Sequence, residues 1–261
     1  MTPWMVLVLF FVTERSGEAV TSGNVLWSVK RNFIPDFQAT GDQMAMTSVT
    51  ATSGACAALC TVGDWCNSFS FAPGNGTCDL YSLQFINNGS AAVPSGDVKY
   101  YTPCKDECPQ SENFIWDRRS DLCFLVVTQP AVGNSWLEAN SSCAARGLAL
   151  VSLNTVHKLD AVVRTLRNNP TLQGVDYYIG ASRPLSRWNT AFPASGQDYR
   201  WVNGDPVDTV SARSYWAIGN PDNNFEQENV LLLNRLRDFS IHDRTATSDS
   251  PAAYICEKVI N

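Results

Sequence analysis

The residues with the widest chemical repertoire in this 261-residue chain are its nine cysteines and two histidines. The cysteines stand at positions 56, 60, 66, 78, 104, 108, 123, 143 and 256, and the histidines are His157 and His242. Structural zinc sites use closely spaced pairs such as Cys-x2-Cys, but this chain has no such pair and no histidine near a cysteine cluster. We therefore expect a disulfide framework, with one odd cysteine left for an interchain bond or a free thiol.

The same residues argue against catalysis. A serine or cysteine hydrolase needs a histidine beside its nucleophile, yet His157 lies off the apolar face of an expected helix and disulfides account for the cysteines. There is no Gly-x-Ser-x-Gly turn and no phosphate-cradling glycine-rich loop. Acidic residues such as Asp222 and Glu228 are more often solvated or metal-binding than catalytic when no cleft defines them. The sequence predicts a binding protein and not an enzyme.

Length and charge limit the architecture and the partners. The chain has room for two domains of about 100 to 150 residues. A net charge of -6 and a pI near 4.9 make nucleic acids and anionic membrane surfaces unfavourable partners, because both would repel the chain. We therefore expect no nucleic-acid and no membrane partner.

The N-terminal segment is typical of secreted proteins. The apolar block at residues 4–12 is too short to cross a hydrocarbon layer of about 30 Å, and it resembles the core of a secretory leader. Gly17 and Ala19 offer a cleavage site, so residues 1–19 are predicted to be a signal peptide, with the cut there or a few residues later. Three sequons, at Asn75, Asn88 and Asn140, are compatible with a secreted, extracellular glycoprotein.

Residues 24–104 predict a small, strand-rich domain with alternating stretches at 69–71 and 98–100. A short helix over 53–59 would place Cys56 and Cys60 on one face. The order Cys-x3-Cys-x5-Cys-x11-Cys, with Asn67-Ser-Phe-Ser-Phe71 after the third cysteine and Cys78-Asp-Leu80 at the fourth, resembles a PAN/apple domain. The resemblance implies a disulfide-bonded α+β domain with the pairs Cys56–Cys78 and Cys60–Cys66; an unrelated disulfide-bonded β domain is the alternative.

Cys104 has no expected partner within this domain. Members of the PAN/apple family usually join their two ends by a further bond, but residues 27–33 contain no cysteine. We therefore hypothesise a disulfide-linked homodimer through Cys104.

Residues 108–258 carry a longer pattern. Cys108 and Cys123 would close a hairpin that ends in the strand 125–127. A first helix buries Trp136, Ala139 and Cys143 and stops at Gly147, before a strand over 148–151. A second helix, capped by Asn154 or Thr155 and ended by Pro170, has Val156, Leu159, Val163 and Leu166 on its apolar face.

These elements and their motifs resemble a C-type lectin domain. The motifs, in family order, are Trp136-x2-Ala-x3-Cys143-x3-Gly147-x2-Leu150, Tyr178-Ile-Gly-Ala181, Tyr199-x-Trp201-x2-Gly204, Trp216-x2-Gly219-x-Pro221 and Tyr254-Ile-Cys256-Glu257. The resemblance implies an α+β fold of two helices, mixed antiparallel sheets and a long loop region, with a Cys143–Cys256 bond worth about 4 to 5 kcal/mol. The family's second bond is missing, because Asn229 or Val230 and Ala246 stand near its positions. A metal, or packing around Trp188, Trp201 and Trp216, would have to hold the loop instead.

The resemblance also implies a ligand site. Lectins of this family hold calcium with a Glu/Gln-Pro-Asn/Asp triplet, a following Glu and an Asn-Asp pair, which correspond here to Asn220-Pro221-Asp222, Glu228 and His242-Asp243. Calcium takes hard oxygen ligands, so the His242 nitrogen is a poor substitute for the family's Asn. The amide-first, carboxylate-third order resembles the galactose-type order. The implied function is calcium-dependent binding of a carbohydrate or glycoprotein. The alternatives are a calcium-independent protein-binding module and, for residues 220–224, a plain polar surface turn.

Overall fold

The computed structural model describes residues 14–15, 19–22, 25–29, 44–84, 97–109, 113–128, 135–185, 198–207, 215–223, 228–246 and 253–260. The chain divides into two compact units, Met1–Glu107 and Cys108–Asn261. Each unit combines helix with a mainly antiparallel sheet, so the fold class is α+β. Among the described residues, no helix has the length and apolar character needed to span a bilayer.

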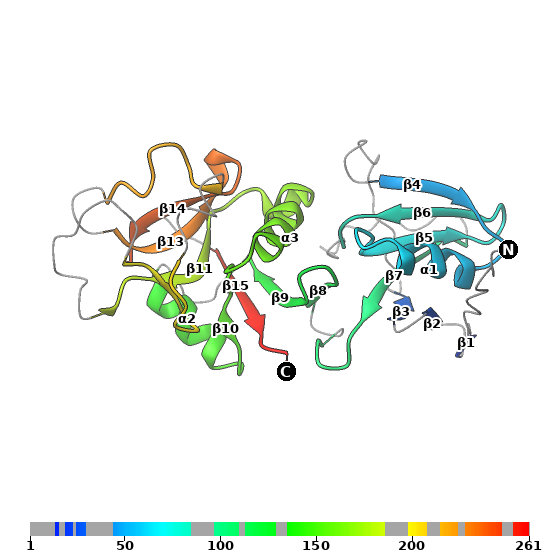
Figure 1. Cartoon of the computed structure of the whole chain (residues 1–261), viewed down its shortest axis with the longest axis horizontal. Helices are drawn as coiled ribbons and strands as arrows, with labels where there is room; N and C mark the ends of the chain where they lie inside the picture. The colour runs from blue at the N-terminus through cyan, green and yellow to red at the C-terminus, as the bar shows by residue number, and fades with distance from the viewer. Residues whose placement is uncertain are drawn as a thin grey trace, which may run out of the picture. The chain divides into compact units, whose positions relative to one another are not determined.

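In its described residues, the N-terminal unit packs a helix against a seven-stranded sheet (Figure 1). Its helix is α1 (Ser53–Val62), which starts where the Thr52 side chain accepts a hydrogen bond from the Ala55 N–H at 3.1 Å. The strand order is β1-β2-β3-β7-β5-β6-β4. The strands are β1 (Glu14–Arg15), β2 (Ala19–Ser22), β3 (Val25–Val29), β4 (Met44–Val49), β5 (Ser68–Ala72), β6 (Thr77–Tyr81) and β7 (Lys99–Cys104).

The core of this unit lies between α1 and the sheet. The Phe69 ring stacks on the Tyr101 ring at 4.6 Å and meets the Trp27 ring edge-on at 5.2 Å. Val20 and Ser22 of β2 are also buried. Cleavage of the predicted leader after Ala19 would therefore keep the core complete, whereas a cut beyond residue 22 would remove part of it. Most of residues 1–19 lie outside the described residues.

The C-terminal unit is built on a sheet of order β14-β13-β11-β15-β9-β8, with β10 paired to β15 and β12 paired to β11. Between the described strands of this unit, every pairing is antiparallel except that of β11 with β15. The strands are β8 (Ile115–Asp117), β9 (Leu122–Val127), β10 (Ala149–Leu150), β11 (Tyr177–Ser182), β12 (Arg200–Trp201), β13 (Glu228–Asn234), β14 (Ser240–Thr245) and β15 (Ala253–Lys258). Two short 3-10 turns are η2 (Pro170–Leu172) and η6 (Arg235–Arg237).

Two helices pack in this unit, and both begin at side-chain caps. Helix α2 (Trp136–Ala144) buries Trp136, Ala139 and Cys143, and the left-handed Gly147 lets the chain turn back so that the Leu148 N–H reaches the Cys143 carbonyl at 3.0 Å. Helix α3 (Val156–Arg167) is capped by Thr155, not by Asn154. The assignment of Val156 to its apolar face is wrong: Val156 is 47% exposed, because it lies in the first turn, ahead of the packed residues that begin at Leu159.

Four disulfides tie the two units internally. The bonded pairs are Cys56–Cys78, Cys60–Cys66, Cys108–Cys123 and Cys143–Cys256. These are the four pairs expected from the sequence. Cys143–Cys256 joins α2 to β15 across 113 positions, at the centre of a buried cluster that includes Trp136, Tyr178 and Leu232. Cys104 is a half-buried free cysteine at the end of β7, opposite Leu26 of β3.

Candidate functional site

The first part of the candidate site is a turn held on the edge of β14. The Ala217 N–H donates to the Ile241 carbonyl at 2.9 Å, and the Asn220 N–H donates back to the Ala217 carbonyl at 2.9 Å. Gly219 has a φ of 92°, the left-handed region that a type II turn requires at this position. The Asn220–Pro221 peptide that follows is cis. The turn therefore presents Asn220 and Asp222 beside β14.

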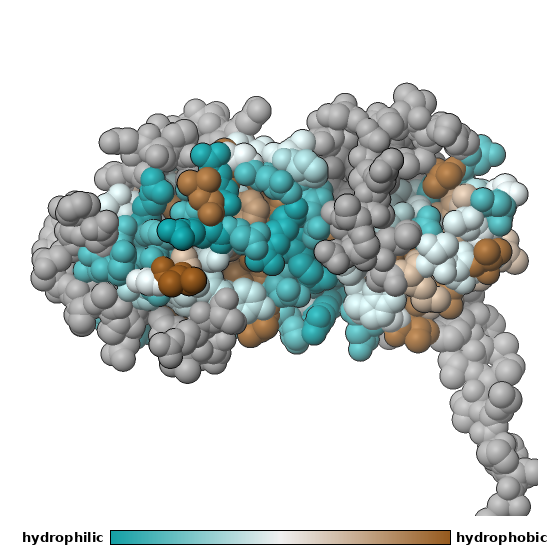
Figure 2. Space-filling view, turned by 90° about the horizontal axis from the view of Figure 1, so that it is seen from above, coloured by the Kyte–Doolittle hydropathy of each residue, from teal (hydrophilic) through white to brown (hydrophobic). Residues whose placement is uncertain are grey.

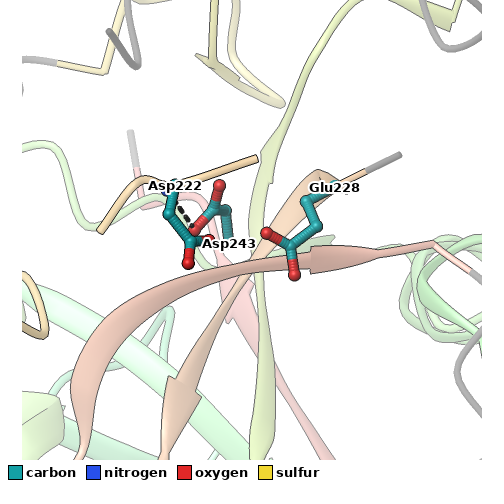
Figure 3. Close-up of side chains that lie close together, drawn as sticks. All are labelled: Asp222, Glu228 and Asp243. Atoms are coloured by element: carbon teal, nitrogen blue, oxygen red, sulfur yellow. Dashed lines mark hydrogen bonds between the residues drawn. The ribbon is translucent and has the colours of Figure 1, made fainter. Parts of the chain in front are cut away.

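The β13–β14 hairpin supplies two further carboxylates. Glu228 opens β13, and Asp243 lies on β14 opposite Leu231, with an irregular register between Glu228 and Val230. Glu228 is 9% exposed and Asp243 is fully buried, whereas Asp222 is exposed. Carboxylate oxygens of these three residues lie within 4.8 Å of one another (Figure 3). Three acids from separate segments therefore converge on one small volume.

The backbone of the turn is latched to the Asp243 side chain. One Asp243 carboxylate oxygen accepts from the Asp222 N–H at 3.2 Å, and the other accepts from the Asn223 N–H at 2.8 Å (Figure 3 draws the bond to Asp222). The Asn223 side-chain oxygen in turn accepts from the Glu228 N–H at 3.3 Å, and the Tyr199 hydroxyl donates to the Glu228 carbonyl at 2.7 Å. These hydrogen bonds therefore fix the backbone that carries Asp222 and Glu228.

The electrostatics of the carboxylate cluster favour a bound cation. Burial raises the pKa of Asp243, the nearby Asp222 carboxylate raises it further, and the bonds from the Asn223 and Asp222 backbone act in the opposite direction. Burial raises the pKa of the Tyr199 phenol, and the charges of Asp243 and Glu228 add to that rise. Concentrated negative charge in a poorly solvated place is stabilised by a cation.

The donor set suits calcium. Calcium prefers six to eight hard oxygen ligands, and this site brings three carboxylates together. The Asn220 side-chain oxygen is buried and accepts no hydrogen bond within the described part of the chain, a state that costs about 1 to 3 kcal/mol when nothing compensates it. The three converged carboxylates fit the ion, and a calcium ion that Asn220 also coordinated would satisfy its buried oxygen.

His242 does not join this group. It precedes Asp243 on β14, and successive side chains of a strand point to opposite faces. Its Nδ1 lies 2.6 Å from the Asp243 carbonyl oxygen, so the ring donates to the backbone there. The sequence reasoning also missed Asn223 and Tyr199 as parts of the site. The Asn-Pro-Asp-Asn run could have indicated Asn223. Tyr199 stands in one of the quoted family motifs, but nothing in the sequence places it at the site.

The family's second disulfide is absent from this chain, and the described residues near its positions are buried. Val230 and Ala246 are buried in the cluster around Cys143–Cys256, and the Ala246 carbonyl accepts from the Trp136 N–H at 3.0 Å. Asn229 is buried against Arg183. Trp201 and Trp216 are both buried, and Trp188 lies outside the described residues.

The predicted sequons differ in accessibility. Asn75 is exposed in the turn between β5 and β6, where its side-chain oxygen accepts from the Thr77 N–H at 3.0 Å. Asn140 is half-buried on α2, and Asn88 lies outside the described residues.

Comparisons with known proteins match both units. Residues 132–258 match the family model of the lectin C-type domain, and residues 34–105 match that of the PAN domain. The chain is 24% identical over 108 residues to C-type lectin domain family 4 member C of Homo sapiens, covering 41% of this chain and 42% of that protein. It is 30% identical over 88 residues to C-type lectin domain family 4 member F of Rattus norvegicus, covering 34% of this chain and 13% of that protein.

A similar solved structure is that of the C-type lectin CEL-I from Cucumaria echinata, with 20% identity and a TM-score of 0.44, covering 60% of this chain and all of that one. The matched part of the chain spans less than half the length of the two curated relatives. The two family matches follow one another in the same order as the two structural units. The chain therefore contains a PAN domain followed by a C-type lectin domain.

Proposed function

We propose that this chain is a secreted recognition protein whose C-type lectin domain binds carbohydrate through a calcium ion held by Asn220, Asp222, Glu228 and Asp243. The observation that carries the proposal is the convergence of three carboxylates within 4.8 Å, one of them on the turn that also carries the buried, unsatisfied Asn220 oxygen. Under this proposal the chain acts by binding, because the three converging carboxylates are suited to hold a cation.

The side chains of the site supply both the metal ligands and the polar contacts of a sugar. A bound calcium ion supplies open coordination positions for two vicinal hydroxyls of a sugar. The carboxylates accept hydrogen bonds from such hydroxyls, and the Asn220 amide can donate one. An amide at position 220 and a carboxylate at 222 follow the order of galactose-type sites, so galactose is the expected preference. On the face shown in Figure 2, the described surface of this domain is mainly hydrophilic with isolated apolar residues, which suits a polar ligand.

A calcium-independent protein-binding module is the second candidate function. It is favoured by the latch from the Asp222 and Asn223 N–H groups to Asp243, which orders the turn without an ion. The bond between His242 Nδ1 and the Asp243 carbonyl also occupies an oxygen close to the site.

Thermal unfolding distinguishes the two functions. If calcium binds, calcium at about 100 times its dissociation constant should raise the melting temperature of the C-terminal unit by about 5 to 10 °C relative to EDTA. Galactose should raise it further in calcium but not in EDTA, and mannose should have less effect. A melting temperature that is the same in calcium, EDTA and both sugars would favour the protein-binding function. A glycan array in calcium would then identify the preferred sugar.

We also propose that Cys104 links two copies of the chain. The thiol is half-buried, at the end of β7, and the other eight cysteines are bonded in pairs. On a non-reducing gel the secreted protein should run at twice the mass of the chain, and Cys104→Ser should run as a monomer. A wild-type protein that runs only as a monomer would contradict the link.

Secretion and glycosylation follow from the same extracellular assignment. Four disulfides form and persist in oxidising compartments. Among the described sequons, exposed Asn75 is the expected attachment site, and half-buried Asn140 should be modified less. Intact mass spectrometry before and after enzymatic removal of N-glycans tests this, and a mass that does not change would contradict it.

A further inference from the structure

Arg183 is a fully buried arginine at the end of β11, close to the start of β13. It is 1% exposed, and two of its groups contact the same residue. The Arg183 N–H donates to the Asn229 carbonyl at 2.8 Å, and the guanidinium Nη1 donates to the Asn229 side-chain oxygen at 2.9 Å. Backbone and side chain together therefore hold Asn229 across 46 positions of sequence.

A buried guanidinium needs a reason, because removing a charged group from water is costly unless its geometry is well satisfied. Asn229 is neutral, so this contact is a directed hydrogen bond and not an ion pair. It occurs at the irregular register between Glu228 and Val230, where β13 deviates from regular pairing. Such irregularities redirect neighbouring side chains. The contact therefore fixes the backbone immediately after Glu228.

Two other contacts hold the backbone of Glu228 itself. Its N–H donates to the Asn223 side chain at 3.3 Å, and its carbonyl accepts from the Tyr199 hydroxyl at 2.7 Å. Arg183 also acts on that hydroxyl electrostatically, because its positive charge lowers the pKa of Tyr199 while Glu228 and Asp243 raise it. Arg183, Tyr199 and the carboxylates thus form one connected arrangement.

We propose that Arg183 is a positioning residue for the cation site: by clamping Asn229 to the end of β11, its guanidinium aims the Glu228 carboxylate at Asp222 and Asp243 before any ion binds. This inference rests on the proposed function for its calcium readout. The clamp would act like a cross-link in a region where, by the family resemblance, Asn229 or Val230 and Ala246 stand near the positions of a second disulfide. The Arg183 guanidinium acts through its geometry, so its planar arrangement of N–H donors is needed. A positive charge alone would not position Glu228.

The test compares Arg183→Lys, which keeps the charge, with Arg183→Met, which keeps the apolar stem. Both should bind calcium about 10-fold more weakly than the wild type by isothermal titration calorimetry, as expected when support for a metal ligand is lost. Arg200→Lys is the matched control, because Arg200 is an exposed arginine of the same domain whose Nη1 donates to the Gly204 carbonyl. Its calcium affinity should equal that of the wild type.

A second readout needs no metal. In EDTA, amide hydrogen exchange at Arg183 and Glu228 should be faster in both Arg183 variants than in the wild type, and unchanged in Arg200→Lys. If the Arg183 variants fail to fold, Asn229→Ala is the alternative. It removes the side-chain acceptor of the guanidinium and does not change the number of buried charges. It should show the same weaker calcium binding and faster exchange, whereas Asn229→Asp, which keeps an acceptor, should keep both close to the wild type.

Failure of the positioning role and failure of the proposed calcium site give different results. The positioning role would be overturned if Arg183→Lys matched the wild type in both calcium binding and calcium-free hydrogen exchange. Tighter calcium binding by Arg183→Met would also overturn it, because charge repulsion and not geometry would then dominate. A wild type that binds no calcium would overturn the proposed function instead, and the exchange measurement would still decide whether Arg183 holds Glu228 in place.

Discussion

Replacing Cys143 and Cys256 together with alanine is expected to lower the free energy of unfolding of the C-type lectin domain by about 4 to 5 kcal/mol. The bond closes a loop of 113 positions, and removing it frees that loop in the unfolded chain. Both sulfurs are fully buried beside Trp136 and Tyr178, so the loss also leaves unfilled space in the core. Urea unfolding followed by tryptophan fluorescence measures the change.

The matched control is the double alanine variant of Cys108 and Cys123. That bond closes a loop of only 15 positions, so its removal should cost less, about 3 kcal/mol by the same chain-entropy argument. Peptide mapping of the wild type under non-reducing conditions should first recover Cys143 linked to Cys256. A C-type lectin domain that is equally stable with and without the long-range bond would contradict this account of its stability.

Asp243→Asn is expected to weaken calcium binding on the order of 100-fold or more and to remove sugar binding with it. Asp243 is the most buried carboxylate of the cluster, and its side chain also accepts the bonds that hold Asp222 and Asn223. The substitution therefore removes one of three negative charges and loosens the turn. Calorimetric titration of calcium and retention on a sugar column measure the two effects.

Two further variants separate the site from the fold. Asp238→Asn makes the same chemical change at the other end of the β13–β14 hairpin, where Asp238 is exposed and paired with Arg167, and it should leave calcium binding unchanged. Asn tolerates the left-handed backbone of that position. Asp222→Asn changes an exposed carboxylate of the cluster, so it should weaken calcium binding while far-ultraviolet circular dichroism stays that of the wild type. Calcium affinity that is equal in all three variants and the wild type would rule out the proposed site.

The sequence by itself indicated several local elements, and together with the family resemblances it indicated the covalent pairing. Apolar residues at helical spacing predicted α2 with its buried Trp136, Ala139 and Cys143, because a helix repeats its inward face every three to four residues. Resemblance to two families supplied three of the four disulfide pairs, and the expected hairpin supplied Cys108–Cys123. The sequence left the N-cap of α3 undecided between Asn154 and Thr155, since either side chain can accept the capping hydrogen bond. The structure shows that Thr155 is the cap.

The candidate ligands were also readable from the sequence, since Asn220, Asp222, Glu228 and Asp243 lie in short recognisable motifs. The convergence of the three carboxylates was not, because it depends on the β13–β14 hairpin and on a turn bonded to the edge of β14. The alternation of strand side chains then decided that Asp243 enters the cluster while His242 bonds to backbone.

Arg183 shows most clearly what only the tertiary structure could decide. An arginine in a polar loop is usually solvated, and no spacing or neighbour marks Arg183 as buried. Its partner Asn229 lies 46 positions away, and the two meet because the end of β11 packs beside the start of β13. Helix periodicity, caps and family motifs act over a few residues, whereas the burial of a charge depends on which distant segments the folded sheet brings together.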